Sequence, residues 1–566
     1  MKKIFTLITA TFVAVAAYAQ TRTTTSIQLV SGDERSSVIR FVPGPMVQTD
    51  VITPQGPAVI ISVGEGTPIL KAGAPDLPQL TASVIIPDVG NTSVEIVSST
   101  WHDIQNVEVA PSKGNLYRNQ DPSLVPYTYG EQYGVNSFYP ASAVNPGSPY
   151  ILRDYRGQAI HAIPFQYNPV TKVLRVYDEL VIKVTATGGS GLNEFQRIER
   201  PIVAEYDHTY RSHFLNYNPQ DDTRYTPLID QGEMLIICHG PFMPAMQSFV
   251  AWKNRKGIIT TMVDVATVGN SATNIKNYVA NYYNSNNLAF VLLVGDHAEV
   301  TSSQTTAGPS DNDYAFISGA DSYPELLIGR FSAETSSHVT TMVTRTLEYE
   351  RAPLAGTFYE TCMGIGSNQG PGDDNEMDYE HERNIGNLLL TYNYNTFLEV
   401  YDGSQGGNDA PGSPGATDVS VPVNAGLGLI NYTGHGSTQA FTTTGFSNND
   451  VNALTNTHKW PFIFSVACVN GDFTYSTCFA ESWLRAINTT TQEPTGAVTT
   501  IMSTINQSWN PPMEGQDEMN AILAETVSGN IRRTFGGIAM NGCMKMNDSY
   551  GSAGDEMTDT WTIFGD

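Results

Sequence analysis

Cysteine is scarce in this 566-residue chain, and its count is odd. The five cysteines are Cys238, Cys362, Cys468, Cys478 and Cys543. Secreted domains that depend on disulfides carry even and much denser sets of cysteine. We therefore expect at least one free thiol, and a disulfide framework is excluded as the main support of the fold.

Long apolar runs are missing after the first residues. Two lysines precede an apolar stretch at residues 4–17, which ends in Ala17-Tyr18-Ala19. This pattern predicts a secretory signal peptide over residues 1–19, too short and wrongly flanked for a membrane helix. No later stretch approaches the roughly 18 uncharged apolar residues that a membrane span requires. We expect an exported chain without a transmembrane segment.

Positive charge is also sparse, with 30 basic residues against 56 acidic ones and a formal net charge of −26. Such a surface disfavours nucleic acid and anionic lipid as partners, because both carry dense negative charge. It suits cationic substrates and calcium, although solubility alone explains the charge equally well.

Several enzyme motifs do not occur. The chain has no His-Glu-x-x-His or Gly-x-Ser-x-Gly sequence and no phosphate loop, which argues against a metallopeptidase or a serine hydrolase. Glu380-His381-Glu382 is a poor transition-metal motif, because adjacent residues of a helix point in different directions.

The first part of the chain has a β composition. Residues 20–188 are rich in Val, Ile, Thr, Ser, Pro and Gly, with short alternating runs such as 93–97 and 173–177. Many short strands between turn signals predict an all-β domain, which we bound at residues 20–224. The polar segment from Pro219 to Arg224 is a plausible hinge and processing site.

After Tyr225 the pattern alternates between buried strands and amphipathic helices. Strands are predicted at 234–238, 258–263 and 289–294, with helices at 246–256 and 275–283 between them. This alternation is typical of a parallel sheet covered by helices. A helical pattern at 338–350 leads to Arg351-Ala352-Pro353, so we expect two α/β subdomains, 225–355 and 356–566.

Two apolar runs in the second subdomain each end in a reactive side chain. One run reaches Tyr432 and is followed by His435, and the other covers residues 461–467 and is followed by Cys468. A helix start at Asn448 lies between them, so the unit is predicted as strand, helix, strand. The carboxyl ends of parallel strands share one edge of a sheet, where His435 and Cys468 can meet.

A cysteine beside a histidine suits acyl transfer, because an imidazole can lower the thiol pKa and carry protons. Amide groups at Gly436 and beside Cys468 could stabilise an oxyanion. A packed core cysteine and a structural loop histidine explain the spacing alone about equally well.

Longer motifs favour the catalytic interpretation. Asn431-Tyr-Thr-Gly-His-Gly-Ser437 and Phe462-Ile-Phe-Ser-Val-Ala-Cys-Val-Asn-Gly-Asp-Phe473 strongly resemble the gingipain family of secreted cysteine endopeptidases, relatives of the caspases. The similarity includes Ala110-Pro-Ser-Lys-Gly114 and Thr504-Ile-Asn-Gln-Ser-Trp509 and extends over nearly the whole chain. It implies a caspase-like catalytic domain behind an inhibitory all-β propeptide, with His435 as acid/base, Cys468 as nucleophile, and the Gly436 and Cys468 amides as the oxyanion hole.

The resemblance also implies specificity for arginine. Asp378 matches the aspartate at the base of the primary pocket, and a buried carboxylate that accepts a guanidinium bidentately favours Arg over Lys. Trp509 matches the lid of this pocket, and its walls are expected to be Thr433, Val466, Gln507 and Met513. Arg224 directly precedes the position where mature family members begin, which makes it the expected processing site.

One departure from the family concerns the group behind His435. Family members place a Glu or Asp there, but this chain has Gly366-Ser367-Asn368-Gln369-Gly370-Pro371, with no acid until Asp373. Either the Asn368 amide oxygen orients the imidazole, as an Asn does in papain-like enzymes, or a shifted Asp373 does so.

The resemblance further implies structural calcium and an inhibitory arginine. Calcium favours hard oxygen ligands. One expected site uses Asp296, Ser318 (carbonyl), Asp321, Tyr323 (carbonyl) and Glu325, and a second uses the Phe473 carbonyl and Glu481. Residues 151–157 resemble the family stretch that blocks the active site, so Arg153 or Arg156 is expected to occupy the Asp378 pocket.

The sequence thus predicts a secreted zymogen of a cysteine endopeptidase that cleaves after Arg. Peptides with Arg at the cleavage site and the chain's own propeptide are its expected partners. Lys specificity and a catalytically silent surface or adhesion protein are the alternatives. Because family members continue beyond the final Phe564-Gly-Asp566 into further domains, a truncated form is expected, exported by a bacterial outer-membrane secretion route.

Overall fold

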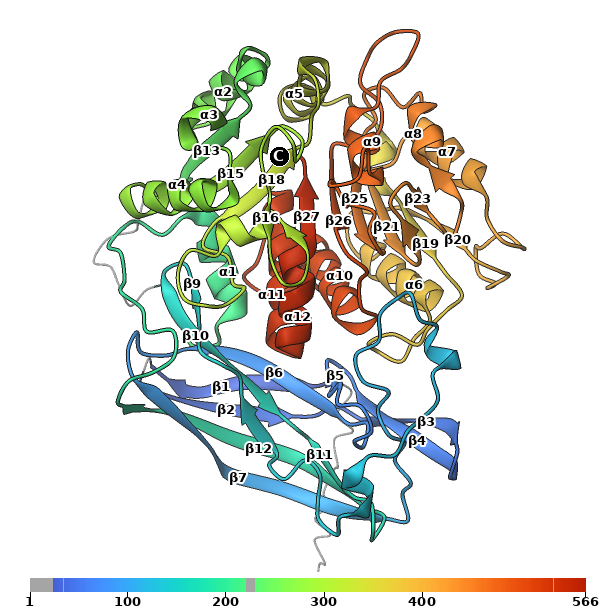
Figure 1. Cartoon of the computed structure of the whole chain (residues 1–566). Helices are drawn as coiled ribbons and strands as arrows, with labels where there is room; N and C mark the ends of the chain where they lie inside the picture. The colour runs from blue at the N-terminus through green and yellow to red at the C-terminus, as the bar shows by residue number, and fades with distance from the viewer. Residues whose placement is uncertain (1–23, 34, 220–229, 533) are drawn as a thin grey trace, which may run out of the picture.

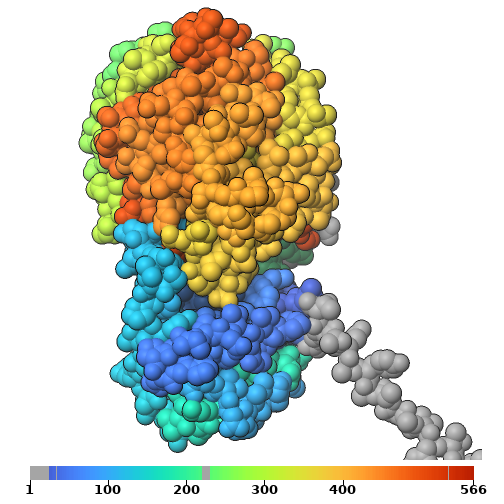
Figure 2. Space-filling model, turned by 90° about the vertical axis from the view of Figure 1, so that its right-hand side faces the viewer, coloured from blue at the N-terminus to red at the C-terminus, as the bar shows by residue number. Residues whose placement is uncertain are grey.

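The computed structural model describes residues 24–33, 35–219, 230–532 and 534–566 (Figure 1). The predicted signal peptide and Arg224 lie outside the described residues. Figure 2 shows two bodies, an N-terminal one and a larger one above it that contains the later residues of the chain.

The N-terminal domain consists of β-sheets packed around an apolar core. One sheet has the order β1-β2-β12-β11, with β7 also on β12, and another has the order β5-β6-β10-β8, with β9 also on β10. Its strands are β1 (Ser26–Gly32), β2 (Ser36–Val42), β3 (Met46–Thr53), β4 (Gly56–Val63), β5 (Thr67–Pro68), β6 (Pro78–Ile85), β7 (Asn91–Gln105), β8 (Val144–Pro146), β9 (Tyr150–Leu152), β10 (Tyr155–Ala162), β11 (Phe165–Asn168) and β12 (Val173–Gly188). The predicted all-β character of this region is confirmed, although the predicted range of 20–224 also includes one α-helix, at Ala204–His213.

The two alternating runs that suggested short strands belong to long ones. Residues 93–97 lie within β7, and residues 173–177 begin β12. These strands pair antiparallel along nearly their whole length, with register shifts such as the one between Tyr177 and Glu179. The shifts are β-bulges, which let the pairing continue where the alternation of side chains is interrupted.

The α/β body contains one ten-stranded sheet. Its order is β14-β13-β15-β18-β27-β26-β25-β21-β19-β20. The strands are β13 (Glu233–Cys238), β14 (Ile259–Asp264), β15 (Leu288–Val294), β18 (Leu327–Phe331), β19 (Thr361–Gly366), β20 (Thr396–Tyr401), β21 (Leu429–Thr433), β25 (Phe462–Val466), β26 (Thr499–Ser503) and β27 (Trp561–Phe564). All neighbours are parallel except β26 and β27.

The last strand joins the two predicted subdomains into this single sheet. β27 pairs with β18 through Arg330 and Phe564, and with β26 along its whole length. The Arg330 side chain is fully buried and its Nε and Nη2 donate to Asp311 at 2.6 and 2.7 Å. The two halves therefore share a continuous hydrogen-bonded core rather than a loose interface.

Helices cover both faces of the sheet. One face carries α2 (Met243–Arg255), α5 (Ser336–Arg351), α7 (Ala416–Ala425), α8 (Asn448–Asn452) and α9 (Phe479–Arg485). The other carries α3 (Val265–Val268), α4 (Ala272–Ser285), α6 (Asp378–Leu389), α10 (Asn510–Leu523), α11 (Phe535–Tyr550) and α12 (Ser552–Thr560). Apolar residues on both faces explain why the strands are continuous hydrophobic runs.

Three short strands follow β21 that the sequence did not predict. β22 (Gly436–Ser437), β23 (Ala440–Phe441) and β24 (Phe446–Ser447) form a small antiparallel sheet between β21 and α8. Strands of two residues carry no detectable periodicity, which explains the omission.

The domains are linked by α1 (Ala204–His213) and by a long excursion of the N-terminal domain. The connection between β7 and β8 leaves the sheets and reaches α6 and α10 (Figure 1; cyan in Figure 2). Along it, Tyr117 forms an antiparallel bridge with Ser508.

The expectation of a free thiol is met. All five cysteines are buried free thiols. No helix in the described ranges has both the length and the apolar character for a membrane crossing.

Candidate active site

His435 and Cys468 follow adjacent parallel strands at the same level. Thr433, the last residue of β21, pairs with Val466, the last residue of β25. His435 and Cys468 each lie two residues further along, so the strand register places both loops at one edge of the sheet. The strand, helix, strand prediction for this unit is correct.

A buried asparagine ties the two loops together. The Asn470 side chain is fully buried, and its Nδ2 donates to the carbonyls of Ser437 at 2.6 Å and Ala440 at 3.0 Å. This residue therefore holds the loop after Cys468 against the loop after His435. Its role was not predicted, because an Asn in the loop after a strand is an ordinary turn residue.

The backbone near the thiol is closely packed. Val469 adopts a left-handed conformation with φ of 50°, and its N–H donates to the Ile505 carbonyl at 2.9 Å. A Cβ on Gly436 would lie 2.3 Å from the Cys468 carbonyl oxygen. Only glycine fits at 436, so its backbone lies directly against that of the cysteine.

The group that contacts His435 is Gln369. Its Oε1 lies 2.7 Å from His435 Nε2 and accepts the imidazole proton. The prediction for Asn368 is wrong because that residue is exposed and turned towards Gly403. Asp373, the other candidate, is buried near His381 instead. The residue that contacts His435 is one position after the predicted one. The sequence could not distinguish the two, because side chains in a loop follow no periodic pattern.

Asp378 forms the base of a buried pocket, and an arginine of the N-terminal domain fills it. Arg118 Nη1 lies 3.0 and 3.1 Å from the two Asp378 carboxylate oxygens, and both side chains are fully buried. Ser367 Oγ donates to Asp378 at 2.6 Å. The Arg118 guanidinium lies 4.4 Å from the centre of the Trp509 ring, which covers it as a cation–π partner.

The chain around Arg118 pairs with the pocket edge like an added strand. Arg118 N–H donates to the Gln507 carbonyl at 2.8 Å, and Trp509 N–H donates to the Leu116 carbonyl at 2.9 Å. Trp509 Nε1 also donates to the Gln120 carbonyl at 2.9 Å. Antiparallel pairing of this kind is a common way to bind an extended peptide.

The prediction that Arg153 or Arg156 fills this pocket is therefore wrong. Arg153 instead donates from Nη1 to the carbonyls of Leu288 and Glu325, at the contact between the domains. Arg156 donates to carbonyls within its own domain, including those of Pro87 and Gly90. Arg118 follows the Ala110–Gly114 motif by four residues, but no charge or periodicity distinguished it.

The expected pocket walls are all buried. Thr433 Oγ1 lies 2.6 Å from Gln516 Oε1, and Met513 packs under Gly372. Both polar atoms of the Gln507 side chain lack a hydrogen-bond partner among the described residues. Val466 is fully buried at the end of β25.

Burial disfavours the charged forms of both reactive groups in this closed arrangement. Burial raises the pKa of the Cys468 thiol above its usual value. Burial and the positive charge of Arg118 lower the pKa of His435. The charge of Arg118 acts on Cys468 in the opposite direction and lowers its pKa, so it is burial that disfavours a thiolate–imidazolium pair.

The residues proposed for calcium fall into two separate groups. Asp321 Oδ1 accepts from Tyr323 N–H at 3.2 Å, and Glu325 Oε2 accepts from Ser318 N–H at 3.2 Å. Asp296 is not with them. It accepts from Arg485 at 3.1 Å, as does Glu481 at 2.7 Å, and among the described residues it makes no ion pair or hydrogen bond to the Asp321 group.

Phe473 was predicted to share the second calcium site with Glu481. Its side chain is buried, and the Arg330 guanidinium carbon lies 5.0 Å from the centre of its ring. Arg485, which donates to both Glu481 and Asp296, supplies the positive charge beside these two carboxylates.

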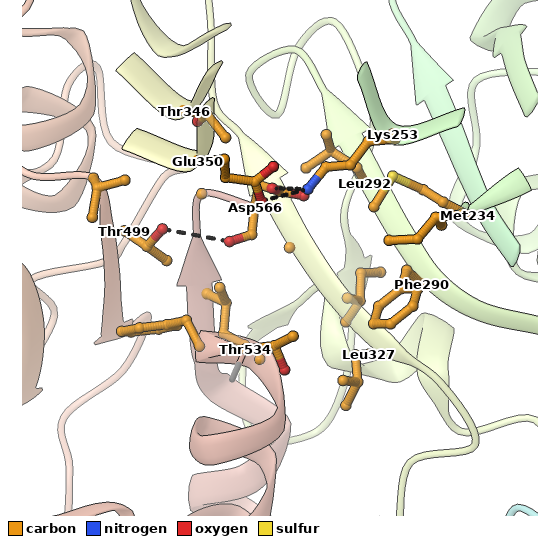
Figure 3. A pocket seen from close by; sticks show the side chains of 18 of the residues that line it. Met234, Lys253, Phe290, Leu292, Leu327, Thr346, Glu350, Thr499, Thr534 and Asp566 are labelled. Atoms are coloured by element: carbon orange, nitrogen blue, oxygen red, sulfur yellow. Dashed lines mark hydrogen bonds and ion pairs between the residues drawn. The ribbon is translucent and has the colours of Figure 1, made fainter. Parts of the chain in front are cut away.

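A mostly apolar cavity of about 210 Å³ lies elsewhere, where the two halves of the sheet meet (Figure 3). Phe290, Leu292 and Leu327 line it, and Lys253 closes one side through ion pairs to Glu350 and Asp566. None of its lining residues belongs to the His435 and Cys468 loops or to the Asp378 pocket.

Comparisons with known proteins agree with this arrangement. Residues 229–566 match the model of peptidase family C25, and residues 19–214 match the C25 propeptide model. The chain belongs to peptidase family C25. The family resemblance inferred from the His435 and Cys468 motifs is thereby confirmed.

Relatives within C25 come from Porphyromonas gingivalis. Gingipain R1 is 40% identical over 554 residues, which cover 96% of this chain and 54% of the relative. Gingipain R2 of strain W83 is 40% identical over 95% of this chain and 73% of its own length. Lys-gingipain of strain ATCC 33277 is 25% identical over 98% of this chain. The C25 chain described here spans about half the length of gingipain R1.

Solved structures are similar as well. The crystal structure of the Arg specific cysteine proteinase gingipain R is 40% identical to this C25 chain, with a TM-score of 0.56 over 60% of this chain and 79% of that one. A complex of the pro- and mature domains of RgpB from Porphyromonas gingivalis is 41% identical, with a TM-score of 0.56 over 59% of this chain and 78% of that one.

Proposed function

We propose that this chain is the zymogen of a cysteine endopeptidase that cleaves peptide bonds after arginine. The observation that carries the proposal is Arg118, which fills the pocket above Asp378 in an extended, strand-like segment beside His435 and Cys468. An arginine side chain of a substrate would make the same contacts. Membership of family C25 and similarity to gingipain R support the reaction class.

The chemistry follows from the groups at the two loops. His435 takes the proton of the Cys468 thiol, and the thiolate attacks the carbonyl carbon. A C–S bond forms, and the carbonyl oxygen becomes an oxyanion near the Gly436 and Cys468 amides. The C–N bond then breaks, and His435 gives its proton to the leaving amine. Water attacks the thioester with His435 as base, which releases the acid and restores the thiol. Gln369 keeps the imidazole oriented throughout.

The preference for arginine rests on charge and on the Trp509 face. The ion pair with Asp378 runs through one nitrogen, Nη1, so the two-nitrogen fork expected from the sequence is not formed in this state. A planar guanidinium stacks on an indole better than an ammonium does. Discrimination against lysine is therefore assigned to stacking on Trp509 and to the length of the substrate side chain.

An arginine-directed chloromethyl ketone tests the proposal. After prodomain removal, mass spectrometry is expected to find the label on Cys468 and on no other cysteine, since the other four are fully buried. The Cys468→Ala chain is the control and should remain unlabelled. Labelling that is absent from Cys468 would refute the proposal.

The N-terminal domain is proposed to hold the enzyme latent. Arg118 blocks the pocket, and Arg153 fastens β9 and β10 to the α/β body through the Leu288 and Glu325 carbonyls. Cleavage after Arg224, which lies outside the described residues, would sever the covalent connection. Export through the predicted signal peptide agrees with this scheme.

Calcium is proposed at Asp321 and Glu325. Glu325 is fully buried, and its Oε1 has no hydrogen-bond partner among the described residues. Burial raises the pKa of Asp321 to about 7, a cost that a bound cation would remove. The cation would supply only structural charge balance there, with the Ser318 and Tyr323 carbonyls as further ligands. The Asp296 and Glu481 group fits calcium poorly, because Arg485 already neutralises it.

A further inference from the structure

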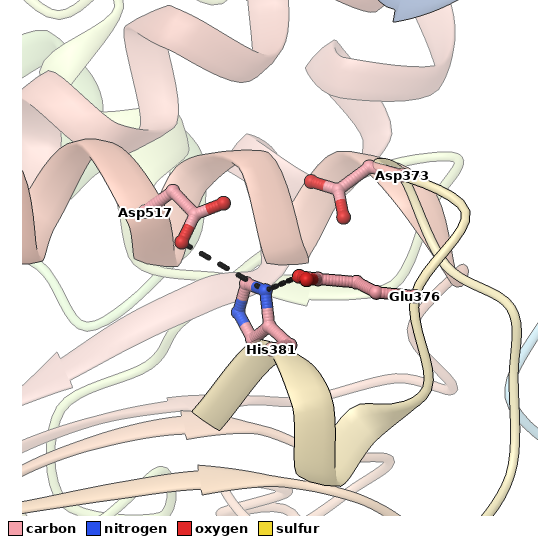
Figure 4. A group of neighbouring side chains, drawn as sticks. All are labelled: Asp373, Glu376, His381 and Asp517. Atoms are coloured by element: carbon pink, nitrogen blue, oxygen red, sulfur yellow. Dashed lines mark hydrogen bonds and ion pairs between the residues drawn. The ribbon is translucent and has the colours of Figure 1, made fainter. Parts of the chain in front are cut away.

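A second group of ligating side chains lies beside the Asp378 pocket, away from the calcium candidates. Asp373, Glu376, His381 and Asp517 each direct one ligand atom to a common point, and these four atoms lie within 4.8 Å of one another (Figure 4). Asp373 and Glu376 come from the loop before α6, His381 from the first turns of α6, and Asp517 from α10. We propose that these four residues form a binding site for a divalent transition metal, with zinc the expected ion.

A buried carboxylate oxygen without a partner supports the site. Asp373 is 7% exposed, and its Oδ2 makes no hydrogen bond to any described residue. Figure 4 shows this carboxylate turned towards Glu376 and His381. An ionised oxygen that is buried without a partner costs free energy, whereas a cation at the centre of the group would satisfy it.

The histidine is oriented as a metal ligand. Gln516 Nε2 donates to Glu382 Oε1 at 3.2 Å and to Asn431 Oδ1 at 3.1 Å, which fixes the direction of its amide. Gln516 Oε1 therefore faces His381 Nε2, at 3.1 Å, as an acceptor. His381 donates from Nε2, so Nδ1 is the nitrogen directed to the carboxylates. Ligating histidines commonly donate their other ring proton in this way.

The remaining contacts are those of a site with three acidic ligands. His381 Nδ1 lies 2.7 Å from Glu376 Oε1 and 3.7 Å from Asp517 Oδ1. Any proton held on Nδ1 would leave to solvent when the metal binds. Bonds of about 2.1 Å from a central ion place opposite ligand atoms about 4.2 Å apart, so small side-chain movements complete the geometry.

The ligand types select the ion. One imidazole nitrogen with carboxylate oxygens suits zinc or manganese, whereas calcium takes oxygen ligands alone. The adjacent triplet Glu380-His381-Glu382 still does not chelate, because His381 finds its partners on a loop and on α10. Only the tertiary structure brings the four ligands together.

A metal here would join two parts of the Asp378 pocket. The loop that carries Asp373 and Glu376 also carries Gln369, and it ends at Asp378. Asp517 lies in α10, which begins directly after Trp509. The ion would thus fix the base of the pocket and the residue behind His435 relative to the pocket lid. The metal site itself does not depend on the proposed peptidase activity.

Metal binding by the full chain with Cys468→Ala tests the proposal, because this background removes the thiol that could itself bind zinc. The chain is stripped with chelator, supplied with millimolar calcium to fill oxygen-only sites, and titrated with Zn²⁺ and Co²⁺. We expect one equivalent of zinc after desalting by elemental analysis, a visible Co²⁺ absorption band, and a higher melting temperature with zinc.

Two variants and a matched control locate the ion. Asp517→Asn and Asp373→Asn should each weaken zinc affinity about tenfold or more. Asp374→Asn removes the same charge from the exposed neighbouring residue and should bind like the parent. The Asp517 side chain is 38% exposed, so its replacement by Asn should leave the fold intact, which circular dichroism checks. Failure of the parent to retain zinc, or parent-like affinity in folded Asp517→Asn, would overturn the assignment.

Discussion

Single side chains decide the state of the proposed active site. Arg118 lies in the pocket, Gln369 contacts the imidazole, and Asn470 holds the two loops together. Arg118 and Gln369 lie outside the motif runs that identified the family, and Asn470 lies within the run from Phe462 to Phe473. Each acts through a contact between segments distant in sequence, and such contacts have no local signature.

Arg118 should supply much of the inhibition by the N-terminal domain. We expect Arg118→Ala in the isolated domain to raise its inhibition constant about 100-fold or more, because removal of one partner of a buried ion pair costs about 3–5 kcal/mol. Competition assays against the activated enzyme measure this constant. Arg40→Ala, a change on the partly exposed strand β2, is the control. An unchanged inhibition constant for Arg118→Ala would contradict the assignment.

Gln369 should act as a positioning residue for His435. Gln369→Ala is expected to lower kcat about tenfold or more with little change in KM, since the imidazole loses its orienting acceptor. Gln369→Glu should retain activity and move the acid limb of the pH–rate profile upward, because a carboxylate favours the imidazolium. If Gln369→Ala changes KM alone, the residue does not position the imidazole.

Cys468 should be poorly reactive in the zymogen. Burial raises its pKa, so less thiolate is present at a given pH than for a free thiol, and the iodoacetamide rate should still be rising at pH 9. After prodomain removal the thiol gains solvent and loses Arg118 from beside His435, and the rate at pH 7 should increase. Rapid alkylation of the intact zymogen at pH 7 would contradict the closed state.

At the scale of elements, the strand ends position the reactive groups. β21 and β25 were predictable because continuous apolar runs that lead into glycine-containing loops indicate buried parallel strands. The sheet β22–β24 and the Gln369 loop were not, since their conformation depends on contacts with β23, α6 and the N-terminal domain.

Loss of the Asn470 side chain should lower both the stability and the activity of the protein, because this residue connects the loops after β21 and β25. Asn470→Ala removes the buried amide that donates to the Ser437 and Ala440 carbonyls, and we expect the free energy of unfolding of the α/β body to fall by about 1–3 kcal/mol. Urea unfolding followed by tryptophan fluorescence measures this change. The value of kcat should fall as well, because the two loops are no longer tied. A variant that keeps full activity would show that the loops are held by other contacts.

At the scale of the whole molecule, the α/β class and the β-rich N-terminal domain follow from composition and alternation. The joining of both halves by β27 does not, because a strand at the end of the chain reaches a partner, β18, more than two hundred residues earlier in the sequence. The inhibitory contact escaped prediction for the same reason. Resemblance directed attention to residues 151–157, whereas the pocket is filled from the excursion between β7 and β8.

The central claim is cleavage after arginine by Cys468. The most direct measurement compares kcat/KM for peptide reporters that differ only in Arg or Lys at the cleavage site, with the prodomain removed and Cys468→Ala as control. We predict turnover of the Arg reporter at least about tenfold faster than that of the Lys reporter, and none by Cys468→Ala. Equal rates, a preference for Lys, or turnover that persists in Cys468→Ala would contradict the account.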